Sequence, residues 1–351
     1  SIDAQGKYLL PGIIDDQVHF RDPGLTHKGS LYTESKAAVE GGVTSVMDMP
    51  NTIPNAITQE LLEEKYTLAS QQALTNYSFF MGATNTNIDE LKKTNAANIC
   101  GIKVFMGAST GNMLVNDTQA LEDIFRLAPC LVAVHAEDED IIQRNLKEHI
   151  DKYGENIPVE NHPLIRSRQA CIAASKKAIE LAMMYNTRLH ILHLSTAEET
   201  ELLNNTIALA LKKITAEVCI HHLWFDDSYY KTLGNKIKCN PAIKLTSDKD
   251  GLFTALLCDK IDIIATDHAP HTIEEKQNHY SKAPSGIPLI QHALPLMMEF
   301  YHQQKITKAK LAEKMCHNPA VCYRIKKRGF IKEGYFADLT LFATANQWKV
   351  Y

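Results

Sequence analysis

Residues able to bind a metal ion occur where short apolar runs of the sequence end. The stretch IIDDQVHFRDPG (13–24) places Gln17, His19 and Arg21 two residues apart at the end of such a run. Alternate residues of a strand share one face, so we expect these three side chains to point the same way. Imidazole nitrogens and carboxylate oxygens suit Zn²⁺, and Co²⁺ or Mn²⁺ can substitute.

Residues of the same types follow the other apolar runs. They are Asp48, Asn51, Lys103, His135, His193, His221, His222, Asp267, His268 and His271. Each has an ordinary alternative, since a histidine that ends a strand is more often a hydrogen-bonded structural residue, and Asp267 could cap the turn DHAP. Their joint occurrence after the first, fourth, fifth, sixth and eighth runs favours a metal centre.

Lys103 is unusual because it lies inside the apolar run GIKVFMG. A buried ammonium without a partner costs several kcal/mol. One solution is carboxylation by CO₂, which gives an anionic carbamate able to bridge two metal ions. The other is an ion pair across the protein interior.

The elements that position these residues alternate between strand and helix patterns. We predict strands at Ile13–His19, Thr44–Met49, Tyr77–Gly82, Ile102–Met106, Leu131–His135, Arg188–Leu194, Glu217–His221 and Ile261–Asp267. The segments between them carry apolar residues at helical spacing. Eight such units predict an α/β fold, a (β/α)₈ TIM-type barrel with its active site at the carboxyl ends of the strands. An open doubly wound sheet is disfavoured, because no GxGxxG follows the first strand.

The chain divides into one large unit and two short ends. Its 351 residues fit one barrel, which we place at 11–330. Residues 1–10 and 331–351 are expected to form part of a small β-sandwich that is truncated here. The polar segment Thr272–Ser285 is predicted to be a loop able to close over substrate.

Composition excludes several classes of protein. A net charge of −4 with 22% charged residues argues against a nucleic-acid binder, and no apolar run is long enough for a membrane span. The eight cysteines are scattered without a CxxC pair, which is typical of reduced thiols, so we expect a cytoplasmic protein.

The motifs, taken together, resemble the amidohydrolase superfamily and look like the dihydroorotase family of the class I type. They are HFRDPG, GGVTSVMDMPNT, GIKVFMG, VHAED, LHLSTAE, CNPAIK and ATDHAPH, and they follow the family order over most of the chain. The pair HFRDPG and MPNT is the discriminating one, because hydantoinases and allantoinases share the metal frame without it.

The resemblance implies a site for a cyclic amide with a carboxylate. It implies a binuclear zinc centre, with His19, carboxylated Lys103 and Asp267 at the more buried zinc and Lys103, His135 and His193 at the other. Arg21 and Asn51, helped by His271, would hold the substrate carboxylate, and Asn240 would face the pyrimidine ring. The planar Arg21 guanidinium can take a carboxylate bidentately, which a lysine could not do.

One position departs from the family pattern. Gln17 stands where the family has a histidine, and a neutral amide oxygen is a weak zinc ligand. Whether one or two zinc ions bind, and whether Gln17 is a ligand or hydrogen-bonds a metal-bound water, therefore stays open. Asp16 is expected to face the opposite side of the strand. Ala242 and Lys244 also stand where other members often carry Pro and Arg.

The implied activity is the reversible cyclisation of N-carbamoyl-L-aspartate to L-dihydroorotate, in de novo pyrimidine (UMP) biosynthesis. A metal-bound hydroxide would be the nucleophile, with Asp267 as general acid and base. A hydantoinase or allantoinase is one alternative, disfavoured by Arg21 and Asn51. A non-catalytic homologue that scaffolds aspartate transcarbamoylase is another, favoured only by Gln17, and a purely structural barrel leaves Lys103 unexplained.

Two further expectations concern assembly and the seventh strand. A homodimer is the default for such an enzyme. His221 and His222 are adjacent strand residues in this prediction, so at most one points into the barrel, where we expect a structural or supporting role.

Overall fold

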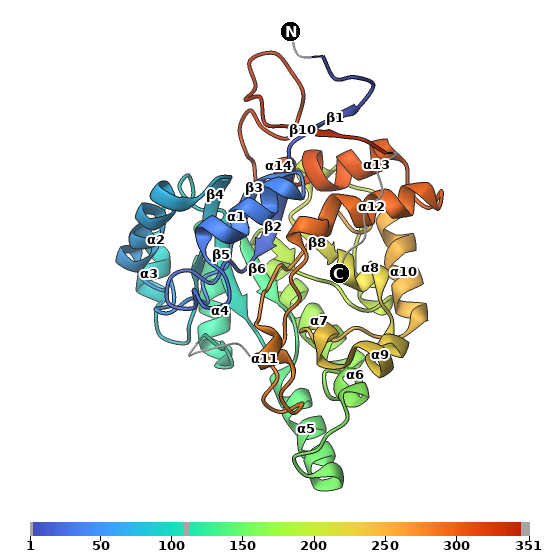
Figure 1. Cartoon of the computed structure of the whole chain (residues 1–351). Coiled ribbons are helices and arrows are strands. Elements are labelled where there is room, and N and C mark those ends of the chain that lie inside the picture. The colour runs from blue at the N-terminus through green and yellow to red at the C-terminus, as the bar shows by residue number, and fades with distance from the viewer. Residues whose placement is uncertain (1–2, 108–112, 345–351) are drawn as a thin grey trace.

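The chain forms a barrel of parallel strands surrounded by helices (Figure 1). The computed structural model describes residues 3–107 and 113–344. Eight strands pair in chain order: β2 (Ile13–Val18), β3 (Val43–Asp48), β4 (Asn76–Gly82), β5 (Gly101–Phe105), β6 (Val132–His135), β7 (Leu189–Ile191), β8 (Ile214–Cys219) and β9 (Ile263–Ala265). The predicted fold class is therefore confirmed.

The first and last strands of the barrel meet through few backbone contacts. Val18 and His268 form an isolated parallel bridge, and the amide of His19 donates to the carbonyl of His268 at 2.7 Å. The buried Asp15 carboxylate spans the same seam, accepting bonds from the Thr266 hydroxyl at 2.5 Å and the Thr266 amide at 3.2 Å. The seam thus brings the residues after β2 beside those after β9.

Helices cover the outside of the barrel (Figure 1). They are α1 (Leu31–Glu40), α2 (Gln59–Gln72), α3 (Ile88–Lys92), α4 (Thr118–Leu127), α5 (Glu139–Tyr153), α6 (His162–Ile165), α7 (Arg168–Tyr185), α8 (Ile220–Trp224), α9 (Tyr230–Leu233), α10 (Thr246–Leu257), α11 (Ile273–Lys276), α12 (Ala293–His302), α13 (Lys308–Ala312) and α14 (Asn318–Cys322). Several begin at a side-chain N-cap, among them Thr58, Asp117 and Ser167, which satisfies amides that the first helical turn leaves unpaired.

Apolar side chains form two cores, one outside the strands and one inside the barrel. The larger core lies between strands and helices, where α7 presents Ala174, Ala178 and Ala182 at four-residue spacing. A smaller core inside the barrel includes Met47 and Phe80. Polar side chains that also point inward occupy the interior near the carboxyl ends of the strands, and they form the candidate site.

Two local details differ from the sequence predictions. The pairing of β2 with β3 is irregular between Asp15 and Val18, and both Asp16 and Gln17 face the interior, so the expectation that Asp16 points away is wrong. Asp16 lies 3.4 Å from His190, whereas Gln17 contacts Asp267. The strand β8 ends at Cys219, two residues earlier than predicted, and α8 follows at once.

The chain ends form a small antiparallel pair beside the barrel. Strand β1 (Tyr8–Pro11) pairs with β10 (Leu339–Phe342), and the two lie at the end of the molecule opposite α5 (Figure 1). The hydroxyl of Thr340 donates to the carbonyl of Gly42 at 2.7 Å, which ties the pair to the barrel. The predicted β-sandwich segments include residues 1–2 and 345–351, which lie outside the described residues. Within the described ranges, no helix combines the length and apolar character needed to cross a membrane.

Candidate functional site

The residues predicted for the more buried metal meet where β2 and β9 end. His19 Nδ1 lies 2.7 Å from Asn51 Oδ1, and His19 Nε2 lies 3.1 Å from Asp267 Oδ1. The amide oxygen and the carboxylate oxygen both only accept, so each contact is a hydrogen bond when the ring nitrogen that faces it carries a proton. Burial opposes ionisation of Asp267, but His19, His221 and Lys103 outweigh it and lower its pKa.

Gln17 joins this group as a hydrogen-bond donor. Its Nε2 donates to Asp267 Oδ1 at 3.1 Å, while its Oε1 lies 3.9 Å from the sulfur of Cys219. A histidine ligand would present a lone pair to a metal ion here. Gln17 instead presents an N–H to the Asp267 carboxylate. The substitution therefore changes the polarity of the site, not only its ligand strength.

The residues predicted for the second metal form a separate pair. His135 Nδ1 lies 3.0 Å from His193 Nε2, and both rings are buried. The other nitrogen of His135 donates to Glu137 at 2.7 Å, and Glu137 is paired with Arg166 at 2.6 Å. Burial raises the pKa of Glu137, but Arg166 and His135 more than reverse this and hold it below its ordinary value.

This pair fits a metal ion. Burial lowers the pKa of His135 and of His193, which keeps both rings neutral, the form that binds zinc. Two nitrogens on a tetrahedral zinc ion lie about 3.3 Å apart, close to the separation found here. A carboxylate behind a ligating imidazole, the place of Glu137, is the usual way to fix its tautomer and raise its basicity.

Lys103 on β5 interacts electrostatically with both groups, with Asp267 in the first and with His135 in the second. Its side chain is 1% exposed, and no carboxylate of the described residues lies within ion-pair distance, so the predicted alternative of an ion pair is not what the structure shows. The amine lies 4.5 Å from the ring centre of Phe105. Burial lowers its pKa to about 7, with Asp267 and Glu217 opposing the shift. A large neutral fraction is thus available at neutral pH, and the neutral amine is the form that reacts with CO₂.

A cationic group stands beside the first set. Arg21 donates through Nε to the carbonyl of Pro270 at 3.1 Å, and its NH2 group lies 3.0 Å from His271. Lys28 lies 3.2 Å from the other nitrogen of His271. Burial, then the charges of Arg21 and Lys28, lower the pKa of His271 to about 3, so its ring is neutral. Burial lowers the pKa of Arg21 to about 10, which leaves it charged at neutral pH.

Other polar residues near the strand ends are engaged elsewhere. Asp48 forms a buried ion pair with Lys65 at 2.7 Å and accepts from the amide of Phe20, which fixes the chain after β2. His268 is held between Glu34 and backbone amides after residue 288. The side-chain oxygen of Asn240 is buried without a hydrogen-bond partner in the described part of the chain.

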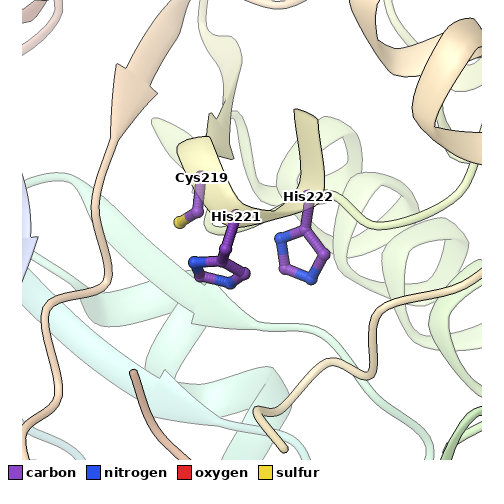
Figure 2. Close-up of side chains that lie close together, drawn as sticks. All are labelled: Cys219, His221 and His222. Atoms are coloured by element: carbon purple, nitrogen blue, oxygen red, sulfur yellow. The ribbon is translucent and has the colours of Figure 1, made fainter. Parts of the chain in front are cut away.

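The two residues at the seventh strand end both face inward. His221 and His222 lie on α8, with ring centres 4.2 Å apart, beside Cys219 (Figure 2). The expectation that at most one points into the barrel is wrong, because strand alternation does not apply to residues of a helical turn.

Lys244 donates to Ser195 at 2.9 Å and to the carbonyl of Ala242.

The segment Thr272–Ser285 begins with α11 and is tied down at several points. Lys276 donates to the carbonyls of Lys238, Pro284 and Gly286 at 2.9–3.0 Å. Glu275 pairs with Lys28 at 2.9 Å. The segment therefore lies docked over the group that contains Arg21.

Backbone strain marks the same region. Arg21, His193 and Asp267 have φ values of 66°, 38° and 47°, in the left-handed region that residues other than glycine rarely adopt. Such conformations cost of order 1–3 kcal/mol each and gather at functional sites.

Sequence reasoning missed several partners of these residues. Glu137 lies two residues after His135 in VHAED, a spacing that could have indicated a carboxylate supporting the imidazole. Arg166 and Lys28 gave no comparable signal, because their contacts depend on how distant segments pack. Cys219 went unnoticed as a donor because its run was read as a strand continuing to His221.

Comparisons with known proteins identify the family that the chain matches. The model of the amidohydrolase family matches residues 8–350. A dihydroorotase of Carboxydothermus hydrogenoformans is 34% identical over 366 residues, which cover 97% of this chain and 78% of the relative. A dihydroorotase of Methanosphaera stadtmanae is 31% identical over 352 residues, covering 99% and 79%.

Solved structures with this fold include other cyclic amidases. An L-hydantoinase (dihydropyrimidinase) from Arthrobacter aurescens superposes with a TM-score of 0.90 at 26% identity, covering 96% of this chain and 76% of that one. A dihydropyrimidinase from Brevibacillus agri has a TM-score of 0.85 at 24% identity, covering 97% and 77%, and supports the fold alone.

Proposed function

The chain belongs to the amidohydrolase family, and from this premise we propose that it is a dihydroorotase. The reaction is the reversible cyclisation of N-carbamoyl-L-aspartate to L-dihydroorotate, a step of de novo pyrimidine biosynthesis. The hydrolysis of cyclic amides is common to the dihydroorotases and hydantoinases that it resembles. The observation that carries the choice between them is the charged, buried Arg21 beside the proposed metal ligands.

Arg21 provides a binding group for the substrate carboxylate. Its bonds to Pro270 and His271 fix the guanidinium plane. The group can then donate hydrogen bonds to a carboxylate without further ordering of the Arg21 side chain. His271 is neutral and can contribute a hydrogen bond, but not a second charge. Charge-assisted bonds of this kind are the strong ones in proteins.

The donor set fits zinc on the grounds of ring geometry and neutrality given above. His135 and His193 would hold one ion together with carboxylated Lys103, and His19, Lys103 and Asp267 would hold the other, with Gln17 contributing weakly or not at all. When bound, zinc lowers the pKa of water to about 7 and polarises the amide carbonyl. The lowered pKa of Lys103 supports its carboxylation.

Asp267 is placed to move the proton. Its carboxylate is ionised, because its pKa is lowered, so it can accept a proton from the attacking water. It would then donate that proton to the ring nitrogen that leaves. His19 and Gln17 both contact Oδ1 of Asp267, which orients the carboxylate.

A hydantoinase-type activity is the second candidate, supported by the fold similarity to the L-hydantoinase. The hydantoin ring carries no carboxylate, so that reaction would leave the buried Arg21 charge without a partner. An unpaired buried charge is costly, and the site therefore favours an anionic ring.

The test is turnover of L-dihydroorotate and of hydantoin by the zinc-supplied protein and by Arg21→Met. We expect dihydroorotate hydrolysis by the wild type and a loss of about 100-fold in kcat/KM in the variant, since two charge-assisted hydrogen bonds are removed. Arg126→Met, at an exposed arginine on α4, is the control. Hydantoin turnover that does not respond to Arg21→Met would favour the second candidate. No turnover of either ring by a folded, zinc-loaded protein would favour the non-catalytic homologue.

Assembly remains part of the proposal. We predict that the chain forms a homodimer. We also propose that it associates with aspartate transcarbamoylase. Analytical ultracentrifugation of the chain alone and mixed with aspartate transcarbamoylase checks both.

A further inference from the structure

A second group of metal-type ligands lies beside the site described above and supplies none of the metal ligands proposed for it. Cys219, His221 and His222 are 0%, 1% and 3% exposed, and one donor atom from each lies within 4.8 Å of the others. Figure 2 shows the three side chains projecting to the same side of the turn that joins β8 to α8. A thiol and two imidazoles form a set suited to zinc.

The imidazoles have nitrogens left without partners. His222 Nε2 donates to the carbonyl of Pro241 at 3.1 Å, which leaves Nδ1 with a lone pair and no donor. His221 interacts with the backbone of Thr266, but neither of its ring nitrogens makes a hydrogen bond of acceptable geometry within the described residues. Buried polar atoms are nearly always satisfied, so these nitrogens call for an occupant. A carbonyl behind His222 also fixes its tautomer, as carbonyls do for metal-ligating histidines.

The local field favours a cation. Burial raises the pKa of the Cys219 thiol, and the carboxyl groups of Glu217 and Asp267 raise it further. Of these two groups, Asp267 is the one that attracts a divalent ion, because its pKa is lowered, whereas burial raises the pKa of Glu217 to about 8. Burial lowers the pKa of His221 to about 4, so its ring is neutral and able to bind metal.

Another cluster in the barrel shows the contrast. Asp16, His190 and Glu217 also lie close together. Both nitrogens of His190 are used there, by Thr215 at 2.8 Å and by Glu217 at 3.1 Å. Both nitrogens of that ring are therefore engaged and the imidazole is not a free ligand, although neither carboxylate oxygen of Asp16 has a hydrogen-bond partner within the described residues.

We propose that Cys219, His221 and His222 bind a zinc ion, separate from the ions that His135, His193, His19 and Asp267 would hold. Each zinc–nitrogen bond is about 2.0–2.1 Å and a zinc–sulfur bond about 2.3 Å, so small side-chain shifts close the set around one ion. Three protein ligands leave a fourth position for water or a neighbouring group. The ion ties the start of α8 to the interior where Gln17 contacts Cys219.

The test is Co²⁺ titration of the full chain after removal of metals by a chelator. Co²⁺ bound by a thiolate gives a charge-transfer absorption in the near ultraviolet that nitrogen and oxygen ligands do not give. We expect this band in the wild type, its loss in Cys219→Ser, and its marked weakening in His222→Gln. The zinc-loaded wild type should also hold one more zinc ion per chain than either variant, by mass spectrometry under non-denaturing conditions.

Two controls separate this site from the rest of the molecule. Cys316→Ser removes a buried core thiol whose hydrogen bond, among the described residues, is to the carbonyl of Pro11 at 3.3 Å, and it should keep the band. His193→Asn, which disables the neighbouring centre, should also keep it. A band that disappears in His193→Asn but persists in His222→Gln would assign the thiolate to that neighbouring centre and overturn the proposal.

The wild-type protein gives a measurement that does not depend on the folding of variants. Anomalous diffraction at the zinc absorption edge should show a peak among the three side chains. Zinc peaks at His135 and His193 with none among Cys219, His221 and His222 would overturn the proposal, as would a Co²⁺-loaded wild type without the charge-transfer band.

Discussion

Gln17 has the opposite hydrogen-bonding character from the imidazole expected at its position. Its N–H points to Asp267 Oδ1, and His19 Nε2 faces that oxygen as well. A histidine ligand would give the lone pair of a neutral nitrogen to a metal ion. Gln17 instead stabilises the Asp267 carboxylate directly, by a hydrogen bond. The residue therefore supports the negative charge on Asp267 through a direct hydrogen bond.

The first prediction concerns Gln17→His. Adding an imidazole ligand should strengthen zinc binding at the His19–Asp267 centre by about 10-fold or more. Changing a residue that only supports a metal ligand already alters metal affinity by about that factor. Competition with a chromophoric chelator measures the affinity. Gln17→Met, which removes the N–H without adding a ligand, is the control and should not strengthen binding. Equal affinities in Gln17→His and the wild type would mean that residue 17 does not reach the ion.

The second prediction concerns Asp267→Asn. An amide cannot accept the proton of the attacking water, so kcat should fall by about 100-fold or more, the usual contribution of a positioned base. KM should change little, because in the proposed binding mode the substrate carboxylate is held by Arg21 and not by Asp267. Steady-state kinetics with L-dihydroorotate at saturating zinc gives both constants, and zinc content is measured alongside. Retained turnover in a zinc-loaded variant would remove Asp267 from the mechanism.

At the scale of elements, the strands were predictable and their ends were not. Runs such as GIKVFMG are buried on both faces, and that burial gives a strong apolar signal in the sequence. The irregular pairing after Asp15 gives no such signal, although it decides that both Asp16 and Gln17 face inward. The helical turn at His221 likewise depends on how α8 packs.

The docked segment Thr272–Ser285 yields the third prediction. Glu275 is 29% exposed, and it accepts from Lys28 and from the amide of Thr272 at 3.0 Å. Burial alone would raise its pKa, but these bonds lower it from 4.5 to about 2. A carboxyl group whose pKa is lower in the folded state stabilises the fold above its ordinary pKa and loses this effect as pH falls through the folded value. Docking should therefore weaken between pH 4.5 and 2.

Hydrogen exchange of the segment tests this. At pH 6, Glu275→Gln should reduce the free energy of local opening by about 1 kcal/mol, a value discounted for solvent screening. The difference from wild type should shrink as pH falls from about 4.5 towards 3. Glu274→Gln, at the exposed neighbouring glutamate of α11, should behave like wild type. A difference that does not depend on pH would show that the charge of Glu275 plays no part in docking.

At the scale of the whole molecule, barrel closure brings the site together. The alternation of strands and helices was enough to predict a closed barrel, and strand order then placed His19, Lys103, His135, His193 and Asp267 at one end. Contacts between side chains distant in sequence, such as Glu137 with Arg166, could not be predicted, because they depend on packing that no local pattern encodes. The seam between β2 and β9 is the same kind of feature.

The fourth prediction tests that seam through Asp15. Its carboxylate accepts from the Thr266 hydroxyl, the Thr266 amide and the Gln17 amide at 2.5, 3.2 and 3.3 Å. Asp15→Ala leaves these buried donors unpaired at about 1–3 kcal/mol each. Among the described residues, Asp117→Ala removes a single side-chain bond, the one accepted from the amide of Ala120 at the start of α4, and it should cost about 1 kcal/mol.

Calorimetry with a chelator present compares the two variants without any contribution from metal binding. The thermal midpoint should fall at least twice as far for Asp15→Ala as for Asp117→Ala, because several buried donors lose their acceptor at the seam between the first and last strands of the described barrel. Equal shifts would mean that the bridge between Val18 and His268 closes the barrel without Asp15. In that case His19 and Asp267 would owe their proximity to the backbone bridge alone, and activity at 25 °C should survive the substitution.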